Sequence, residues 1–236
     1  MKTFPIKNKK ALVTGASSGI GRAIALKLQE HGVTIFLVGR NIGRLREIPK
    51  AFRYKADLAN SKEISNLHKL VKKDAGDIDI LVHSAGLLSQ GGFESVSIAE
   101  LEEHWRVNVA APYLLTKIFL PSLKKQKGEV VFVNSSVGLR AKAEAAHYSA
   151  EKHALRAIAD SLRAEINPKG VRVMSIFAGS TATDMQKKRY KMEARKYYPA
   201  QLLQPEDIAE MVIHSISLPR TAEVTDLVIR PFINHL

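Results

Sequence analysis

The stretch HYSAEKHAL, residues 147–155, places a phenol and an ammonium four residues apart, at Tyr148 and Lys152. On a helix, residues four apart share one face and lie about one turn from each other. A free tyrosine has a pKa of about 10, and a nearby cation lowers that value toward neutral pH. The pair could therefore pass a proton to or from an oxygen atom, although the same spacing also occurs on helix surfaces that have no role.

A glycine-rich segment near the N-terminus, TGASSGIG (14–21), has the spacing G-x-x-x-G-x-G at Gly15, Gly19 and Gly21. It lies between an apolar run and an amphipathic segment, which is the strand-to-helix context of a dinucleotide-binding turn. Glycine lets backbone N–H groups approach a pyrophosphate, and the N-terminus of the following helix favours negative charge. The alternative interpretation is a plain tight turn.

Several features occur in one order along the chain: TGASSGIG, the Ala-Gly pair at 85–86, Asn108, the serines of NSSVG and the Tyr-x-x-x-Lys unit. This combination resembles the short-chain dehydrogenase/reductase family over nearly the whole chain. The C-terminal piece LPRTAEVTDLVIRP is similar to the subgroup that acts on 3-hydroxy acids and related small alcohols. The resemblance implies hydride transfer between a nicotinamide cofactor and an alcohol or carbonyl compound.

The resemblance also implies roles for the candidate proton-transfer residues. Tyr148 would give a proton to a carbonyl oxygen during reduction or take one from an alcohol during oxidation. Lys152 would lower the pKa of that phenol and hold the ribose hydroxyls of the nicotinamide. Asn108 would hold a water molecule that links Lys152 to solvent, whereas a buried amide satisfied by the backbone is the competing interpretation.

Two adjacent serines could orient the carbonyl group. Ser135 stands 13 residues before Tyr148 and three before Gly138, as the serine of the family does, and is therefore preferred over Ser136. Its hydroxyl would stabilise the negative charge that develops on the oxygen. The alternative is a hydroxyl at the end of a strand that only caps a loop.

Arg40 indicates which cofactor the protein prefers. It follows the last glycine by about 20 residues, where an acidic side chain usually holds a free ribose 2′-hydroxyl. A guanidinium there suits a 2′-phosphate, so the sequence predicts NADP (NADPH) as cofactor, unless Arg40 is only a solvated loop residue. Arg22 and Arg44 could add to the same positive field. No metal is expected.

Other loops that follow predicted strands complete the cofactor site that the resemblance implies. Asp57 would accept from the adenine amino group, or only form a turn before a helix. His83 replaces the usual asparagine and is predicted to be structural. FAGSTATDM (177–185) is similar to the family's Pro-Gly-x-x-x-Thr loop, with Ala178 in place of proline. The predicted cofactor contacts are Gly15, Ser17, Ser18, Gly19, Ile20, Gly21, Arg40, Asp57, Leu58, Ala85, Gly86, Asn108, Tyr148, Lys152, Gly179, Ser180 and Thr183.

A basic segment, QKKRYKMEARKYY (186–198), lies where the family has its substrate lid, here predicted at about 184–204. It contains six basic residues and three tyrosines. The segment is either a solvated helical face or a cationic rim that steers a substrate carrying a carboxylate or phosphate. The basic residues are Lys187, Lys188, Arg189, Lys191, Arg195 and Lys196.

The elements that position these residues follow from alternating apolar runs and amphipathic segments. We predict a single Rossmann-type doubly wound α/β domain over 1–236, with a mostly parallel seven-stranded sheet flanked by helices on both faces. Ser61 is predicted to cap one helix, and Pro112 to bend another. The predicted strands are 10–15, 33–39, 51–58, 78–86, 128–136, 171–179 and 224–232, and the predicted helices are 19–32, 61–76, 99–125, 147–166 and 205–216.

The composition narrows the remaining functional classes. The chain has 236 residues, no cysteine and a formal charge of +13. The lack of cysteine excludes thiol catalysis and disulfides and fits a cytoplasmic protein. No apolar run is long enough for a membrane span, and no nucleic-acid-binding motif accompanies the charge, so a solvated basic surface is favoured over nucleic-acid binding. The predicted partner is a small carbonyl or alcohol substrate, which could be anionic.

Two further expectations concern assembly and a rival function. The long helices at 99–125 and 147–166 are apolar enough to pair across a two-fold axis, so a homodimer or homotetramer is expected, as in the family. A catalytically silent NADP(H)-binding sensor or regulatory protein is the alternative function. Such a sensor needs none of the proton chemistry, so the set Asn108, Ser135, Tyr148 and Lys152 favours the enzyme.

Overall fold

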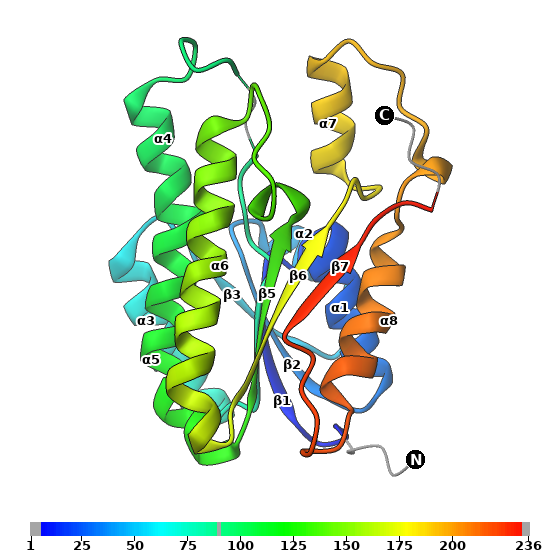
Figure 1. Ribbon diagram of the computed structural model, residues 1–236. Helices are drawn as coiled ribbons and strands as arrows, with labels where there is room; N and C mark the ends of the chain where they lie inside the picture. Colours follow the sequence, from blue (N-terminus) through cyan, green and yellow to red (C-terminus); the bar gives the residue numbers. More distant parts are fainter. Residues whose placement is uncertain (1–5, 89–90, 233–236) are drawn as a thin grey trace.

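The computed structural model describes residues 6–88 and 91–232. Its centre is a parallel sheet of seven strands in the order β3-β2-β1-β4-β5-β6-β7 (Figure 1). The predicted fold class is confirmed. The strands are β1 (Lys10–Thr14), β2 (Thr34–Gly39), β3 (Phe52–Lys55), β4 (Ile80–His83), β5 (Glu129–Ser135), β6 (Arg172–Ala178) and β7 (Asp226–Ile229).

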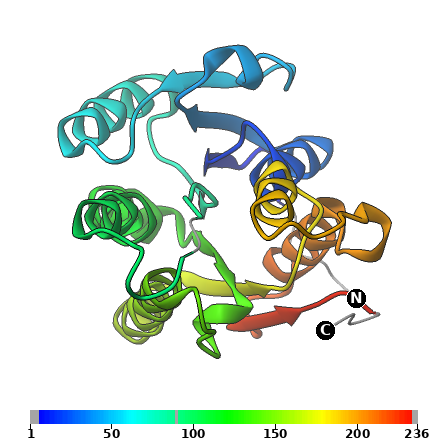
Figure 2. The same ribbon diagram turned by 90° about the horizontal axis from the view of Figure 1, so that it is seen from above.

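Helices cover both faces of this sheet, with α3, α5 and α6 on one face and α1 and α8 on the other (Figures 1 and 2). The helices are α1 (Gly19–Glu30), α2 (Ile42–Leu45), α3 (Ser61–Ala75), α4 (Ile98–Trp105), α5 (Ala111–Gln126), α6 (Ala146–Ile166), α7 (Asp184–Met192) and α8 (Pro205–Ile216). Shorter turns are the π-helix η1 (Arg106–Ala110) and the 3₁₀ helices η2 (Ser136–Gly138), η3 (Asn167–Lys169) and η4 (Pro199–Gln201).

The sheet separates two hydrophobic cores. In β1, Ala11 and Val13 pack toward α1 and α8, whereas Leu12 packs toward α3 and α5. Alternate residues of a strand point to opposite faces, and both faces are covered, which is why the strands are apolar throughout. The strand order reverses between β1 and β4, and ligands bind in such sheets beyond the carboxyl ends of the strands at this point.

The predicted helix 99–125 is in fact α4, the π-helix η1 and α5. Pro112 is the second residue of α5, directly after the wide turn. Proline has no N–H group, so it cannot donate to the carbonyl of Asn108 four residues earlier. A widened turn rather than a simple bend therefore joins the two helices, and Asn108 lies within it.

The predicted cap of α3 is wrong by one residue. The Asn60 side chain accepts a hydrogen bond from the backbone N–H of Lys62 at 3.0 Å, so Asn60 is the N-cap and Ser61 is the first helical residue. Asparagine and serine cap helices about equally well, so the sequence could not distinguish these neighbours. Pro205 begins α8 as predicted, and α1 ends at Glu30 before Gly32, which has a left-handed φ of +76°.

The loops after β1 and β4 are packed directly against each other. The Thr14 hydroxyl accepts hydrogen bonds from the backbone N–H groups of Ser84 (3.1 Å) and Ala85 (3.2 Å) and donates to Val82 O (3.2 Å). A Cβ atom on Gly15 would lie 2.6 Å from the backbone of Ser84, closer than atoms can approach. Glycine at 15 is therefore required by the joined loops as well as by its φ of +68°.

Candidate functional site

A cleft of about 990 Å³ opens along the carboxyl edge of the sheet, beneath α7. It is lined by most of the predicted cofactor contacts: Gly15, Ser17, Ser18, Gly19, Ile20, Arg40, Asp57, Leu58, Ala85, Gly86, Tyr148, Lys152 and Thr183. The lining does not include Gly21, Asn108, Ser135, Gly179 or Ser180. It does include residues that the sequence analysis missed: Ser84, Leu87, Leu88, Val107, Val133, Asn134 and Met185.

The glycine-rich turn leads directly into the N-terminus of α1. Ser18 is the N-cap, but its side chain makes no capping hydrogen bond, and no acidic residue lies in the first turn. The first turn of α1 therefore supplies no carboxylate of its own to neutralise the positive end of the helix at the cleft. A Cβ on Gly21 would lie 2.5 Å from the carbonyl oxygen of Gly15, so Gly21 lets α1 pack against the turn although it does not line the cleft.

Tyr148 and Lys152 lie one turn apart on α6, with Lys152 Nζ 5.6 Å from the centre of the Tyr148 ring. Lys152 is only 6% exposed and donates a hydrogen bond from Nζ to Val133 O at 3.3 Å. The end of strand β5 holds the helix in place, because Asn134 Nδ2 donates to the Lys152 backbone carbonyl at 3.0 Å. Gly138 permits this contact, since a Cβ there would lie 2.9 Å from the same carbonyl oxygen.

The two candidate serines have different surroundings. The Ser135 side chain forms a hydrogen bond with Tyr148 and also accepts one from the backbone N–H of Val137 at 3.4 Å. It therefore both contacts the phenol and caps the 3₁₀ turn η2, so the two interpretations of this serine are compatible. Ser136 is the first residue of η2.

Burial dominates the electrostatics of the Tyr–Lys pair. Burial raises the pKa of Tyr148 to about 12, although the hydrogen bond from Ser135 opposes this shift. Burial also lowers the pKa of Lys152 to about 8, with Glu151 opposing. The net shift of the Tyr148 pKa in the protein alone is therefore upward rather than toward neutral pH, because loss of water disfavours the charged form of both groups. The phenol is therefore neutral at pH 7 and able to donate a proton.

Asn108 is buried in the π-helix, where its amide is satisfied by protein groups. Its Oδ1 accepts from the Leu87 backbone N–H at 2.8 Å, and its Nδ2 donates to Leu87 O at 3.0 Å and to Glu151 Oε2 at 2.6 Å. The competing interpretation of a buried, satisfied amide thus describes the side chain. Asn108 also connects the loop after β4 to α6.

His83 has the structural role that was predicted. It is buried, with Nε2 2.8 Å from the Thr116 hydroxyl and its ring stacked on Phe132 at 4.8 Å between centroids. Burial lowers its pKa to about 3, so the ring stays neutral across the physiological range. It does not line the cleft.

The far end of the cleft is exposed and basic. Arg40 and Arg44 line it, together with Asp57 and the buried Leu58. Asp57 Oδ1 accepts from the Ala59 backbone N–H at 3.0 Å, which is the turn role that was its alternative interpretation.

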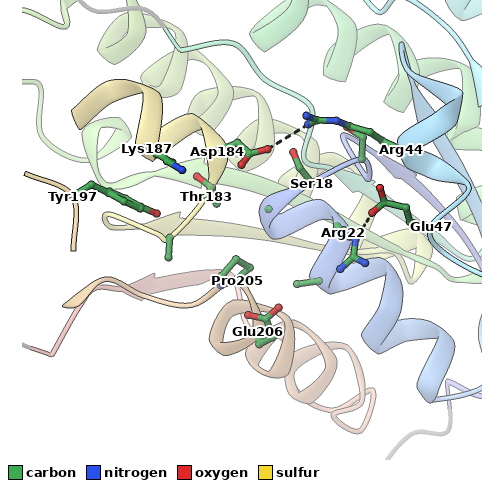
Figure 3. A pocket seen from close by; sticks show the side chains of 14 residues that line it. Ser18, Arg22, Arg44, Glu47, Thr183, Asp184, Lys187, Tyr197, Pro205 and Glu206 are labelled. Carbon is green, nitrogen blue, oxygen red and sulfur yellow. Dashed lines mark hydrogen bonds and ion pairs between the residues drawn. The ribbon is translucent and has the colours of Figure 1, made fainter. Parts of the chain in front are cut away.

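Arg22 points elsewhere. It lies 3.9 Å from Glu47 and lines a separate side pocket of about 430 Å³ behind the glycine-rich turn (Figure 3). Arg22 therefore does not line the cleft itself, and its contribution to the positive field there stays a prediction. Arg44 lines both spaces and forms an ion pair with Asp184 at 3.3 Å, which connects α2 to the start of α7.

The helix α7, which lies within the predicted lid segment, contributes residues to the lining of the cleft. Thr183 caps it by accepting from the Gln186 backbone N–H at 3.2 Å, while Gly179 and Ser180 anchor its base through backbone bonds to Ile229 and Leu203. Lys187, Lys188, Lys191 and Arg195 line the cleft. Arg189 instead pairs with Glu193 at 2.8 Å.

Two kinds of feature are absent from residues 6–88 and 91–232. No helix there has the length and apolar character that crossing a membrane requires. No group of three or more His, Asp or Glu side chains in these ranges could hold a metal ion.

A parallel sheet with a glycine-rich turn at its topological switch point and a cleft above it defines a dinucleotide-binding α/β protein. The sequence model of the short chain dehydrogenase family matches residues 9–194. The chain belongs to this family of oxidoreductases.

Relatives and solved structures agree with this assignment. An uncharacterised oxidoreductase of Staphylococcus epidermidis is 34% identical over 232 residues, covering 96% of this chain and 98% of its own length. The structure of an alcohol dehydrogenase from the archaeon Thermococcus sibiricus, complexed with 5-hydroxy-NADP, superposes with a TM-score of 0.87 at 29% identity, covering 98% of this chain and 99% of its own. The structure of a metagenomic short-chain oxidoreductase in complex with NADP superposes with a TM-score of 0.83 at 28% identity, covering 98% of this chain and 100% of its own.

Proposed function

We propose that this protein is an NADP(H)-dependent oxidoreductase that interconverts a ketone or aldehyde and an alcohol, with Tyr148 as general acid and base. One observation carries the proposal: Tyr148 and Lys152 together line the inner end of the cleft that begins at the glycine-rich turn, and the Ser135 side chain contacts the phenol of Tyr148. A neutral, partly buried phenol beside a hydroxyl suits protonation of a carbonyl oxygen.

The residues present fit a dinucleotide. The uncapped N-terminus of α1 offers backbone N–H groups for a pyrophosphate, and the cleft extends from there to Lys152 in one direction and to Arg40 in the other. Lys152 would hold the ribose hydroxyls next to the nicotinamide. When bound, the reduced nicotinamide supplies the hydride.

The chain's own groups would then handle the proton and the charge. The substrate carbonyl oxygen would be held by the hydroxyls of Ser135 and Tyr148, and Tyr148 would transfer its proton to that oxygen in reduction. In oxidation the same atoms work in reverse, and the alcohol proton passes to the phenolate.

The preference for NADP(H) is supported by Arg40 and Arg44 at the exposed end of the cleft, where no acidic side chain follows β2. The two similar structures contain 5-hydroxy-NADP and NADP, which also supports this preference. Asp57 would accept from the adenine. A small carbonyl or alcohol substrate under the α7 lid, a homodimer or homotetramer, a single domain over 1–236 and a cytoplasmic location stay predictions.

A substrate panel tests the function directly. Purified protein is mixed with NADPH or NADH and with neutral ketones, aldehydes, 3-oxo acids and 3-oxo thioesters, and consumption of the reduced cofactor is followed by absorbance. Turnover of at least one carbonyl compound with NADPH, at a higher kcat/KM than with NADH, is expected. Tight NADPH binding without turnover of any carbonyl compound would instead favour a silent sensor and contradict the proposal.

A further inference from the structure

A block of buried polar side chains lies between α6 and the α4–η1 helix, beside the Tyr148–Lys152 pair. His104 and Asn108 are four residues apart on one helix, and His147 and Glu151 are four apart on the other. All four side chains are buried. The two histidine rings meet edge-on with centroids 5.6 Å apart, and Asn108 Nδ2 donates to Glu151 Oε2 at 2.6 Å.

Glu151 is the exceptional member of this block because it is fully buried, with 0% exposure. Its Oε2 accepts from Asn108, but its Oε1 has no hydrogen-bond partner within residues 6–88 and 91–232. A buried carboxylate with an unpaired oxygen is expensive in free energy, and a glutamate at such a position needs a reason. Burial raises the pKa of Glu151, while Asn108 and Lys152 oppose that shift.

Glu151 is connected to both walls of the inner cleft. Through Asn108 it reaches the backbone N–H and C=O of Leu87, which lines the cleft beyond β4. It also precedes Lys152 in the helix, and its negative charge raises the pKa values of Lys152 and Tyr148. The titratable groups that surround it are therefore Tyr148, Lys152 and His147 on α6 and His104 on α4.

We propose that Glu151 is a positioning residue for the proposed reaction: its carboxyl group clamps Asn108 and the Leu87 loop to α6, and its negative charge keeps Lys152 protonated. This inference rests on the proposed function and deepens it. The clamp needs an acceptor oxygen at the position of Oε2, whereas the electrostatic effect needs a negative charge. Substitutions can separate the two requirements.

Glu151→Gln keeps an acceptor for Asn108 and removes the charge. Lys152 should then lose its proton at lower pH, because the negative charge of Glu151, which raises its pKa, is gone. The alkaline limit of alcohol oxidation, and of NADPH binding measured by fluorescence without substrate, should move down by about one pH unit. Glu165→Gln is the matched control, since Glu165 is exposed on the same helix and should leave both profiles unchanged.

Glu151→Asp keeps the charge but shortens the reach to Asn108. It should leave the alkaline limit in place and lower kcat several-fold, because the Leu87 loop is no longer held against α6. Glu151→Ala should combine both defects. The contrast between Gln and Asp distinguishes a positioning role from a general loss of folding, and circular dichroism of each variant checks the fold.

Thermal unfolding against pH gives a reading that is independent of turnover. Since the native pKa of Glu151 is raised above 4.5, its contribution to stability is lost as pH rises through the native value. Above that pH, Glu151→Gln should be at least as stable as the wild type. If the pH profiles of alcohol oxidation and NADPH binding do not shift in Glu151→Gln, while Tyr148→Phe is inactive, the role of Glu151 is overturned and the proposed function is retained. Normal turnover in Tyr148→Phe would overturn the function itself.

Discussion

The charged and titratable side chains at the two ends of the cleft differ in their exposure to water. At the inner end, Tyr148 is partly buried and Lys152 is buried, and burial shifts their pKa values to about 12 and about 8. At the outer end, Arg40 is exposed and remains solvated, and the α7 lysines that line the cleft, Lys187, Lys188 and Lys191, are exposed as well. Changes at the inner end should therefore have large, pH-dependent effects, whereas changes at the outer end should be smaller and sensitive to salt.

The largest effect is expected from Tyr148→Phe at the inner end. The change removes one oxygen and keeps the ring, so the fold and the affinity for NADPH should be retained. Carbonyl reduction should fall by about two orders of magnitude or more, the usual share of general acid–base catalysis. Steady-state kinetics with one good substrate checks this, and near-normal turnover would mean that another group donates the proton.

Lys152→Ala should affect both binding and proton transfer. NADPH binding should weaken through lost ribose contacts, and the pH optimum of alcohol oxidation should move upward because the phenol loses its nearby cation. Stability should respond as well. The native pKa of Lys152 is about 8 against 10.5 for an ordinary lysine, so the unfolded chain binds more protons between these values. Unfolding curves should show the wild type gaining stability over this pH range and Lys152→Ala lacking that gain.

The neighbouring serines provide a matched pair for an intermediate effect. Ser135→Ala removes the hydroxyl that contacts Tyr148 and should lower kcat by about tenfold to a hundredfold with little change in NADPH affinity. Ser136→Ala changes the first residue of η2 and should be milder. Equal losses in both variants would show that the 3₁₀ turn, rather than the hydroxyl at 135, is what the reaction needs.

Arg40→Ala tests the outer end. NADPH binding should weaken by at least about 1.4 kcal/mol, or tenfold, with NADH binding nearly unchanged. Arg46 is the control, because it is exposed nearby and does not line the cleft. Titrating NADPH and NADH against both variants measures this. Equal losses of affinity for NADPH and NADH in Arg40→Ala would contradict the assignment of Arg40 to the 2′-phosphate.

The smallest effect concerns the lid cations. With NADPH saturating, kcat/KM for a 3-oxo acid should fall with ionic strength more steeply than kcat/KM for a neutral ketone, because Lys187, Lys188 and Lys191 line the cleft. Arg189 is engaged with Glu193 and should contribute less. If kcat/KM for the two substrates depends on salt in the same way, the lid charges do not steer an anionic substrate and are only solvated.

Much of the fold could be read from the sequence because its signals are local. Apolar strands alternating with amphipathic helices predict a covered parallel sheet, and a glycine-rich turn between strand and helix predicts the nucleotide loop. The limits of local reasoning appear at Ser61, where an adjacent asparagine caps the helix, and in the predicted helix 99–125, which contains a π turn. At the helix cap, asparagine and serine have similar propensities, so the sequence could not choose between them. In the predicted helix 99–125, Pro112 marked the interruption, but its sequence could not show that the interruption is a π turn.

The sequence by itself determined which chemical groups this protein has and their spacing: the turn at Gly15, the phenol and ammonium of Tyr148 and Lys152, and the cation of Arg40. Only the tertiary structure decided what surrounds them. The hydrogen bond between Asn108 and Glu151 joins residues that are 43 positions apart. The ion pair between Arg44 and Asp184 joins residues that are 140 positions apart. The shifted pKa values of Tyr148 and Lys152 also belong to the fold, because burial depends on side chains that distant segments bring together.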